Sequence, residues 1–278
     1  METSQIHLLL IDPQNDFCDL PASYCGSAGQ PALPVPGAHA DMQRVAALVS
    51  KLGPRLKGIT VTKDSHPPVA IERPAFWRMA DGSPVKPFTP ISAASVRDGE
   101  YVPLENVTGV IDYLERLEAT QRYTHMVWPA HCELDTWGHE VHADVQAALT
   151  SWEKAGYGVV GTVLKGLNPM TEHYSAVRAE VVDPADPATD TNWDLLNRLA
   201  GDDVTLVVAG EAGSHCVKST VEHILEADPS VAARMVVLTD GISPVTNFEG
   251  NYAAFLDDMR SRGAQLMTSV ELAARAGC

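Results

Sequence analysis

The stretch VTLVVAGEAGSHCVKSTVEHILEA, residues 204–227, holds the pattern that decides the fold. Its first six residues are apolar apart from one threonine, and a run of this length is typical of a buried strand. A turn with two glycines follows, and apolar residues then recur three and four positions apart over residues 216–227. A buried strand followed by an amphipathic helix predicts one β-α unit of a parallel sheet.

Short apolar runs and longer helical patterns alternate along most of the chain in the same way. The apolar runs are residues 6–11, 58–62, 125–128, 159–164, 204–209 and 235–238. Helical spacing covers residues 39–51, 136–154, 192–200, 216–227, 251–262 and 269–274. This order predicts an α/β fold, namely a doubly wound, mostly parallel six-stranded sheet with helices on both faces.

Two long segments interrupt this alternation. Residues 18–37 contain several Pro, Gly and Ala and are predicted to form a loop, while residues 67–123 begin Pro-rich and carry one helical pattern at 107–120. A connection of that length usually carries function or contacts a partner. Because the apolar runs on both sides fit one sheet, we expect a single domain over 1–278 with a long insertion around 77–123.

Composition excludes several classes of protein. The 278 residues include 20 Lys and Arg against 36 Asp and Glu, a formal charge of −16, and 45% are hydrophobic. The apolar content argues against disorder, and the charge argues against a nucleic-acid partner, which needs a basic surface. No apolar run approaches the roughly 18 residues of a membrane helix, and the first residues lack the Lys or Arg of a signal peptide. We therefore expect a cytoplasmic protein without a membrane partner.

Polar residues that could carry chemistry follow five of the six apolar runs. In an open α/β sheet, ligands bind beyond the carboxyl ends of the strands, so side chains at those ends should meet at one edge. The residues in question are Asp12, then Asp64 and His66, then Trp128 and His131, then Lys165, and finally Cys216. Their convergence would build a site from segments far apart in the sequence.

Cys216 is the candidate nucleophile among five cysteines, an odd number that argues for free thiols over a disulfide framework. At the start of a helix, the macrodipole would lower its pKa, and the preceding Gly and Ala residues would let backbone N–H groups face an oxyanion. Asp12 could accept the thiol proton, and Lys165 could keep that carboxylate ionised. A buried structural cysteine and a structural ion pair between Asp12 and Lys165 are the alternatives.

A second group of residues has the composition of a metal site. Asp64 and His66 are two apart in an extended segment, so both side chains point the same way, and His131 adds a third ligand. Glu72 could be a fourth or an outer-shell ligand. This set suits Zn²⁺, with Mn²⁺ or Fe²⁺ as alternatives. A helix-capping Asp64 and a surface His66 are the competing interpretation.

Three further histidines have open roles. His139 and His142 are three apart on the helix predicted over residues 136–154, so they would share a face. That face could contribute to a metal site or a pocket, or it could be solvated. His215 precedes Cys216 and could tune the thiol or serve a structural hydrogen bond.

Five short segments together resemble a known group of enzymes. They are Asp12-Pro-Gln-Asn-Asp-Phe17, Thr62-Lys-Asp-Ser-His66-Pro-Pro, Trp128-Pro-Ala-His-Cys132, Lys165-Gly, and Gly210-Glu-Ala-Gly-Ser-His-Cys-Val217. In this order they resemble the motifs of nicotinamidases and of the wider isochorismatase-like cysteine hydrolases. The resemblance covers the chain from residue 6 to about residue 240.

The resemblance implies the isochorismatase-like hydrolase fold and a thiolate hydrolase of a small amide, most directly one that converts nicotinamide to nicotinate and ammonia in NAD metabolism. It also implies a homo-oligomer and the cis peptide Glu211–Ala212. By the same resemblance, Asp12, Lys165 and Cys216 would form the catalytic triad, and the backbone N–H groups of Ala212 and Cys216 would bind the oxyanion. The rings of Phe17 and Trp128 would enclose the substrate. The metal ligands would be Asp64, His66 and His131, with Glu72.

The spacing of the metal segments departs from compact nicotinamidases, because His131 follows His66 by 65 positions. The extra region could cover the pocket or form an oligomer contact, and it leaves the substrate open. The alternatives are an amidohydrolase of another small amide or carbamoyl compound and a non-catalytic α/β binding or scaffold protein. An isochorismatase activity is less expected, since cleavage of a vinyl ether needs neither the cysteine nor the metal.

Overall fold

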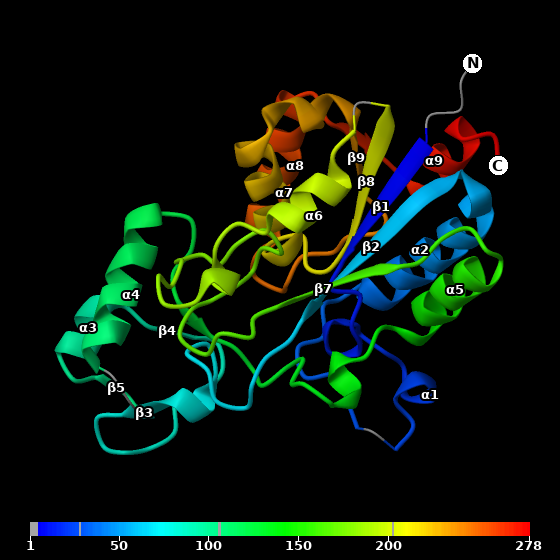
Figure 1. Cartoon of the computed structure of the whole chain (residues 1–278). Helices are drawn as coiled ribbons and strands as arrows, with labels where there is room; N and C mark the ends of the chain where they lie inside the picture. Colours follow the sequence, from blue (N-terminus) through cyan, green and yellow to red (C-terminus); the bar gives the residue numbers. More distant parts are fainter. Residues whose placement is uncertain (1–4, 28, 105–106, 202) are drawn as a thin grey trace.

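Six parallel strands form the central sheet of the computed structural model, which describes residues 5–27, 29–104, 107–201 and 203–278 (Figure 1). Across the sheet the order is β10-β9-β8-β1-β2-β7. The chain therefore extends the sheet in one direction from β1 and in the other from β8, and the two directions meet at a topological switch point. The strands are β1 Gln5–Ile11, β2 Leu56–Asp64, β7 Gly161–Lys165, β8 Val204–Gly210, β9 Met235–Leu238 and β10 Gln265–Met267.

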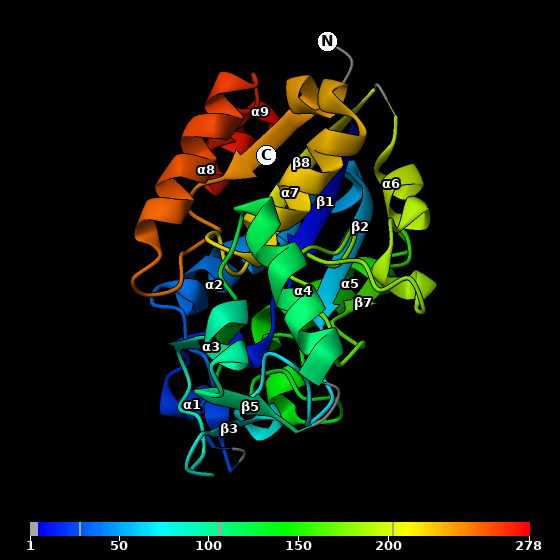
Figure 2. The ribbon, with the colours of Figure 1, turned by 90° about the vertical axis from the view of Figure 1, so that its left-hand side faces the viewer.

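Helices cover both faces of this sheet, as the alternating pattern predicts (Figures 1 and 2). One face carries α2 (Ala38–Leu52), α5 (Ala143–Lys154) and α9 (Ser269–Arg275). The other carries α6 (Trp193–Leu199), α7 (Cys216–Ala227) and α8 (Glu249–Ser261). The predicted α/β class, the parallel sheet and the two helical layers are therefore confirmed.

The two central strands are buried on both faces, which explains why their sequences are mostly apolar. Leu8, Leu9 and Leu10 of β1 are fully buried, and burial of each leucine side chain contributes about 1.5–3 kcal/mol. Where β1 and β8 end, Gly210 pairs with Ile11, and a Cβ on Gly210 would lie 1.9 Å from the Ile11 carbonyl oxygen. Only glycine therefore fits at the point where β8 turns toward α7.

The membership of the sheet differs from the prediction at one strand. Residues 125–128 do not enter the sheet: β6 (Met126–Val127) pairs antiparallel with β4 (Thr89–Pro90) instead. Its Val127 serves a different core, because this side chain is fully buried in a second hydrophobic cluster, whereas Met126 packs against the main core. The sixth strand is β10, whose three residues are only partly buried or exposed and lack the apolar run of a central strand.

The predicted helix over 136–154 begins later than its sequence pattern indicates. A 3₁₀ turn spans Trp137–His139, and α5 starts only at Ala143 after a side-chain cap from His142. His139 and His142 therefore do not share a helix face, and that prediction is wrong. The loop predicted over 18–37 is largely irregular and contains the short helix α1, Ala22–Cys25.

The insertion forms a small layer of its own beyond the carboxyl ends of the central strands (Figures 1 and 2). It contains the antiparallel pair β3 and β5, with the helices α3 and α4 packed against each other. The bounds are β3 Trp77–Met79, α3 Ala93–Arg97, β5 Tyr101–Pro103 and α4 Val107–Thr120. Buried residues of this layer, including Trp77 and Leu114, form the second hydrophobic cluster. The single-domain organisation over 1–278 stays a prediction.

All five cysteines are free thiols, as expected from their odd number. Among the described residues, no helix has the length and hydropathy needed to cross a membrane.

Candidate active site

Four polar side chains meet at the carboxyl edge of the sheet, where the sequence predicts them. Asp12 directly follows β1, Asp64 and Lys165 are the last residues of β2 and β7, and Cys216 opens α7 after β8. Asp64 and Lys165 are also direct partners in the register of those two strands. Each residue comes from a different element, so the sheet itself sets their relative positions.

Lys165 lies at the centre of this group. Its Nζ lies 2.9 Å from Oδ2 of Asp12 and 3.0 Å from Oδ1 of Asp64, and it donates to Sγ of Cys216 at 3.4 Å. A fourth contact, at 3.1 Å, is with the carbonyl oxygen of His173. The Lys165 side chain is 1% exposed. The ammonium group is therefore surrounded by acceptors and links the thiol to both carboxylates.

The carboxylate of Asp12 is held by the neighbouring strand. Thr62 of β2 donates its hydroxyl to Oδ1 of Asp12 at 2.5 Å, and its carbonyl oxygen accepts the Asp12 N–H at 3.1 Å. The backbone of Asp12 has a φ of +44°, which places its side chain off the line of the strand. Thr62 fixes one oxygen and leaves the other for Lys165, a role that sequence reasoning did not assign to it.

Burial dominates the protonation of the nucleophile candidate, contrary to the expectation from its place at a helix start. It raises the pKa of the Cys216 thiol well above the ordinary value, although the nearby Lys165 ammonium opposes the shift. Burial likewise raises the pKa of Asp12, again opposed by Lys165. The Cys216 sulfur and an oxygen of Asp12 lie within 4.8 Å of each other. Cys216 thus rests as a thiol, with a carboxylate close enough to take its proton.

Asp64, His66 and His131 form a second buried cluster beside the first. Oδ2 of Asp64 lies 2.9 Å from Nε2 of His66 and 3.4 Å from Nε2 of His131, and the three atoms all lie within 4.8 Å of one another. One carboxylate oxygen and two imidazole nitrogens are a donor set that fits Zn²⁺. The residues predicted as metal ligands are therefore brought together, with Asp64 shared between this cluster and Lys165.

Glu72 lies behind His66 and not among the three clustered donors. Its Oε1 is 2.9 Å from Nδ1 of His66, the ring nitrogen opposite the one that faces Asp64. Of the two positions predicted for Glu72, this is the outer-shell one, in which it orients the ring. Arg73, which sequence analysis missed, secures the other histidine segment: it donates to the carbonyl oxygens of Pro129 at 2.8 Å and of His131 at 2.5 Å.

The two histidines of the cluster have opposite pKa shifts. Burial lowers the pKa of His66, but the carboxylates of Asp64 and Glu72 together outweigh burial and the value rises to about 9. Burial lowers the pKa of His131 to about 4, so its ring is neutral. Nδ1 of His131 lies 2.8 Å from the Pro129 carbonyl oxygen and 3.0 Å from Nη1 of Arg73, so these contacts hold the ring with Nε2 facing Asp64.

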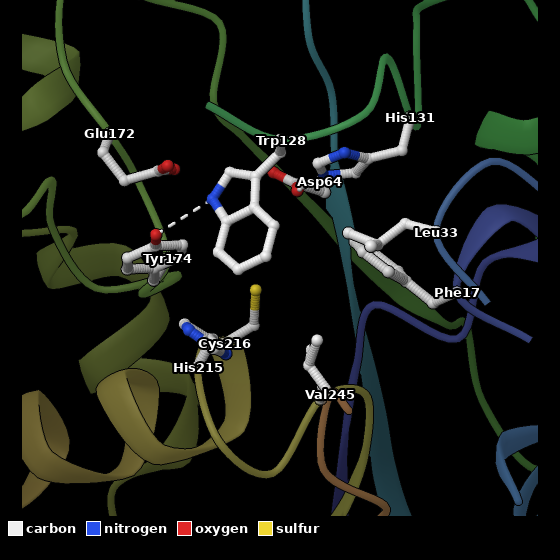
Figure 3. A pocket seen from close by; sticks show the side chains of 11 residues that line it. Phe17, Leu33, Asp64, Trp128, His131, Glu172, Tyr174, His215, Cys216 and Val245 are labelled. Atoms are coloured by element: carbon white, nitrogen blue, oxygen red, sulfur yellow. Dashed lines mark hydrogen bonds and ion pairs between the residues drawn. The ribbon is translucent and has the colours of Figure 1, made fainter. Parts of the chain in front are cut away.

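A narrow slot opens above Cys216 (Figure 3). Phe17 and Trp128 stand on opposite sides of it. Ala212 is also among the lining residues. Trp128 donates its indole N–H to the Tyr174 hydroxyl at 3.0 Å. The slot has a cavity volume of only about 20 Å³. Its aromatic walls and small depth suit a flat group placed edge-on to the thiol.

Glu172 is a lining residue of the slot that sequence reasoning missed. It is 4% exposed, and its Oε1 accepts the N–H of His173 at 3.0 Å, while Oε2 has no hydrogen-bond partner. Burial raises the pKa of this carboxyl to about 8, so it is largely protonated at neutral pH. Glu172 lies in an irregular segment after β7, and no sequence pattern distinguished it from other surface-typical acids.

The remaining histidines have separate environments. Nε2 of His139 lies 2.8 Å from the Ser65 hydroxyl, behind the metal segment, and Nε2 of His142 lies 2.9 Å from Nδ1 of His39, at the start of α5. Neither lines the slot. His215 does line it, and burial lowers its pKa to about 3, so the ring is neutral.

No protein-family model and no curated protein sequence matches the chain. Solved structures do match it, at 1.00 probability, along nearly its whole length. A nicotinamidase and pyrazinamidase from Acinetobacter baumannii has a TM-score of 0.62 at 19% identity, with 98% of this chain and 100% of that one covered. The yeast nicotinamidase has a TM-score of 0.61 at 19% identity, with 95% and 99% covered.

The chain has the isochorismatase-like hydrolase fold. An isochorismatase family protein from Desulfovibrio vulgaris shares it with a TM-score of 0.52 at 20% identity, over 99% of this chain and 100% of that one. A pyrazinamidase from Pyrococcus horikoshii, in complex with zinc, has a TM-score of 0.54 at 19% identity, with 95% and 99% covered. The Glu211–Ala212 peptide is cis, as the resemblance implied.

Proposed function

We propose that this protein is a cysteine hydrolase of a small amide, most directly a nicotinamidase that converts nicotinamide to nicotinate and ammonia. One observation carries the proposal: the Cys216 thiol, the Asp12 carboxylate and the Asp64 carboxylate all meet the ammonium of Lys165 beneath one aromatic slot. A structural ion pair would not need a buried thiol as its third member, and a binding protein would not need the nucleophile at the floor of its pocket.

The reaction follows from these positions. Asp12 accepts the thiol proton while Sγ of Cys216 attacks the amide carbonyl, and the N–H groups of Ala212 and Cys216 stabilise the oxyanion. Collapse breaks the C–N bond, and the departing nitrogen takes the proton from Asp12, so that ammonia leaves and a thioester remains. A water that gives its proton to Asp12 then attacks the thioester. Amide plus water thus yields acid plus ammonia, and the thiol is restored.

Asp64, His66 and His131 would hold a divalent cation, with Zn²⁺ the best fit to one carboxylate and two imidazoles. When bound, the cation supplies an anchor for a lone pair on the substrate and so orients the ring. Glu72 keeps Nε2 of His66 facing the site through its contact with Nδ1. Phe17 and Trp128 would hold the two faces of a flat ring above the thiol.

The comparisons support this proposal without extending to the substrate. Nicotinamidases and pyrazinamidases are among the structures that share the fold, and one of them was solved in complex with zinc. A second substrate class is favoured by Glu172, since its unpartnered Oε2 can form a hydrogen bond to a further polar group on the substrate. That class is another small amide or carbamoyl compound carrying a second N–H or hydroxyl group.

Ammonia release from nicotinamide by the zinc-loaded protein tests the proposal, with Cys216→Ala as the control. We expect turnover by the wild type and none by the variant, together with an acyl adduct on Cys216 in mass spectra of a quenched reaction. If nicotinamide is inert but amides with a second donor react through Cys216, the second class is correct. The thioester mechanism would be overturned if Cys216→Ala hydrolysed an amide as fast as the wild type. It would also be overturned if the wild type hydrolysed no amide of either class.

The cytoplasmic location and the homo-oligomeric state stay predictions from the sequence. Sedimentation of the purified protein would check the oligomeric state.

A further inference from the structure

A second and much larger cavity adjoins the slot. Its volume is about 340 Å³, against about 20 Å³ for the slot itself. The first figure lies in the range of pockets that bind organic ligands, whereas the second is close to the space of a single water. The slot therefore leaves no space for a substituent on a ring held between its aromatic walls, and any further part of a substrate has to lie elsewhere.

The two cavities meet at three side chains that line both of them, namely Trp128, Tyr174 and His215. His215 is adjacent in sequence to the candidate nucleophile. In Figure 3 Tyr174 and His215 lie to the left of the Cys216 thiol, and Trp128 lies above it. A substituent on a ring bound in the slot would therefore reach the larger cavity by passing these residues.

The insertion supplies much of the wall of this outer cavity. Pro90 of β4, Tyr123 and Met126 come from the inserted layer or its end, and they face Phe248 and Asn251 at the start of α8. A region that the simplest form of the fold does not require thus enlarges the space around the slot.

Aromatic rings dominate the lining of the outer cavity. The rings of Tyr123 and His215 are stacked, with centroids 5.7 Å apart and an interplanar angle of 24°, and Phe248 meets His215 edge-on at 4.7 Å. Trp128 lies 6.0 Å from Phe248, centroid to centroid. Rings arranged in this way offer faces and edges to another aromatic group.

The charges near the outer cavity are already compensated. Arg122, which lines it, donates to Ser219 and Glu222 at 2.9 Å and forms an ion pair with Glu226 at 3.3 Å. Lys218 lies 4.9 Å from the centroid of the Tyr123 ring and 2.9 Å from Glu222. An anion would compete with these carboxylates for Arg122, and a cation would compete with Arg122 and Lys218 for the same carboxylates, so neither finds an unpaired partner.

We propose that the outer cavity is the second half of a two-part substrate site and that it binds an uncharged aromatic group. The substrate is then a carboxamide on a flat ring that lies in the slot, with a second ring joined to it by a short linker. This inference rests on the proposed function and narrows its substrate class. It also gives the insertion a role, which is to select substrates by their distal group.

Equilibrium binding tests the proposal without depending on turnover. Zinc-loaded Cys216→Ala protein would be titrated by calorimetry with benzamide as the one-ring probe. The two-ring probes would be benzamides that carry a benzyl or benzyloxy group at the 3- or 4-position. Burial of a second ring in an aromatic cavity predicts that at least one two-ring probe binds at least about tenfold more tightly than benzamide. Equal affinity for all probes would overturn the proposal.

A variant that fills the outer cavity tests whether the higher affinity of the two-ring probes arises there. Asn251→Trp in the same background should reduce the affinity ratio of two-ring to one-ring probe to about one. Ala254→Trp adds the same side chain to an exposed position of α8 and should keep the wild-type ratio. Thr124→Trp fills the cavity from another lining position and serves where Asn251→Trp does not fold. An unchanged ratio in a folded cavity variant would show that the cavity is only an entrance.

Charged versions of the best two-ring probe test the chemistry of the occupant. A carboxylate or an aminomethyl group on the distal ring should lower the affinity about tenfold or more relative to the neutral probe. If either charged probe binds more tightly than the neutral one, the assignment of an uncharged group is wrong. Failure of the proposed function would give a different result. The wild type would then form no acyl adduct on Cys216, while the two-ring probe would still bind more tightly than the one-ring probe.

Discussion

The carboxyl edge of the central sheet and the inserted layer are built on opposite principles. At the edge, Asp12, Asp64 and Lys165 are charged, almost fully buried and held by one another. In the inserted layer, short antiparallel strands and two helices surround a purely apolar cluster that includes Trp77 and Leu114. We infer that the two regions have different roles: the sheet positions the reactive groups, and the insertion determines which substrates reach them.

This contrast has an energetic side. Buried charges that pair with each other have a large desolvation cost and are fixed in place because the loss of one partner leaves the others uncompensated. An apolar cluster has no such constraint and tolerates changes of volume at moderate cost. Substitutions at the edge should therefore remove reactivity, while substitutions in the insertion should alter stability or selectivity.

The largest expected effect is the loss of the triad chemistry. Cys216→Ala and Asp12→Asn should each reduce kcat/KM by about 10⁴-fold or more for any amide that the wild type hydrolyses, because nucleophile and base act as one unit. The double variant should then lose little beyond either single one. Steady-state ammonia release measures all three. Independent losses that multiply in the double variant would show that Asp12 and Cys216 do not act together.

Removal of the central ammonium should be the next largest effect. Lys165→Met leaves two buried carboxylates without their shared partner, and such a loss destabilises a protein by about 3–5 kcal/mol. Urea unfolding of the metal-free protein at pH 7 measures it. Lys57→Met, an exposed position on β2, is the matched control and should change the free energy of unfolding by less than about 0.5 kcal/mol. Similar values for the two variants would contradict the central role of Lys165.

The sequence predicts the edge well because the sheet has a simple rule. Apolar strands of four to eight residues alternate with helices, parallel strands end at one edge, and the residues that follow Ile11, Thr62 and Ala209 therefore had to converge. The five motifs added the roles. What the sequence could not reveal were Thr62 and Arg73 as supports, because each acts through a hydrogen bond to a segment far away in the chain.

The insertion was less predictable for a physical reason. Residues 125–128 look like a central strand by composition, but a run of three apolar residues after His125 is equally suited to a small separate core, and only tertiary packing decides. The converse holds for β10, which joins the sheet without an apolar run. Glu172 was missed because an isolated acid in an irregular segment has the sequence signature of a surface residue.

A change in the inserted core should affect stability more than reactivity. Leu114 is fully buried in the second cluster, and Leu114→Ala should lower the free energy of unfolding by about 3 kcal/mol. Turnover of a one-ring amide by the folded variant at low temperature should remain within about threefold of the wild type. Leu104→Ala, at a half-exposed leucine of the same region, is the control and should have little effect. If folded Leu114→Ala no longer hydrolyses a one-ring amide, the two regions do not have separate roles.

The smallest predicted effect uses one buried histidine from each region. Burial lowers the pKa of His7 in β1 to about 4, and it does the same for His125, which packs against Trp77 and Tyr113 of the insertion. The unfolded chain binds the proton with a pKa near 6.5, so the stability that each neutral ring contributes is present above 6.5 and is lost as the pH falls toward 4. For a shift of this size, the loss between pH 7 and pH 5 is about 2 kcal/mol for each histidine.

His7→Gln and His125→Gln remove these titrations, and each should make the free energy of unfolding less sensitive to pH by about that amount. If the chain is a single cooperative domain, both substitutions act on the same urea transition, followed by far-UV circular dichroism at pH 7 and at pH 5. If the insertion unfolds on its own, a separate transition appears, and only His125→Gln changes its pH dependence. Because His7 pairs with Thr60 inside the sheet and His125 contacts the Ile71 carbonyl beneath the insertion, the two variants report on the two regions independently.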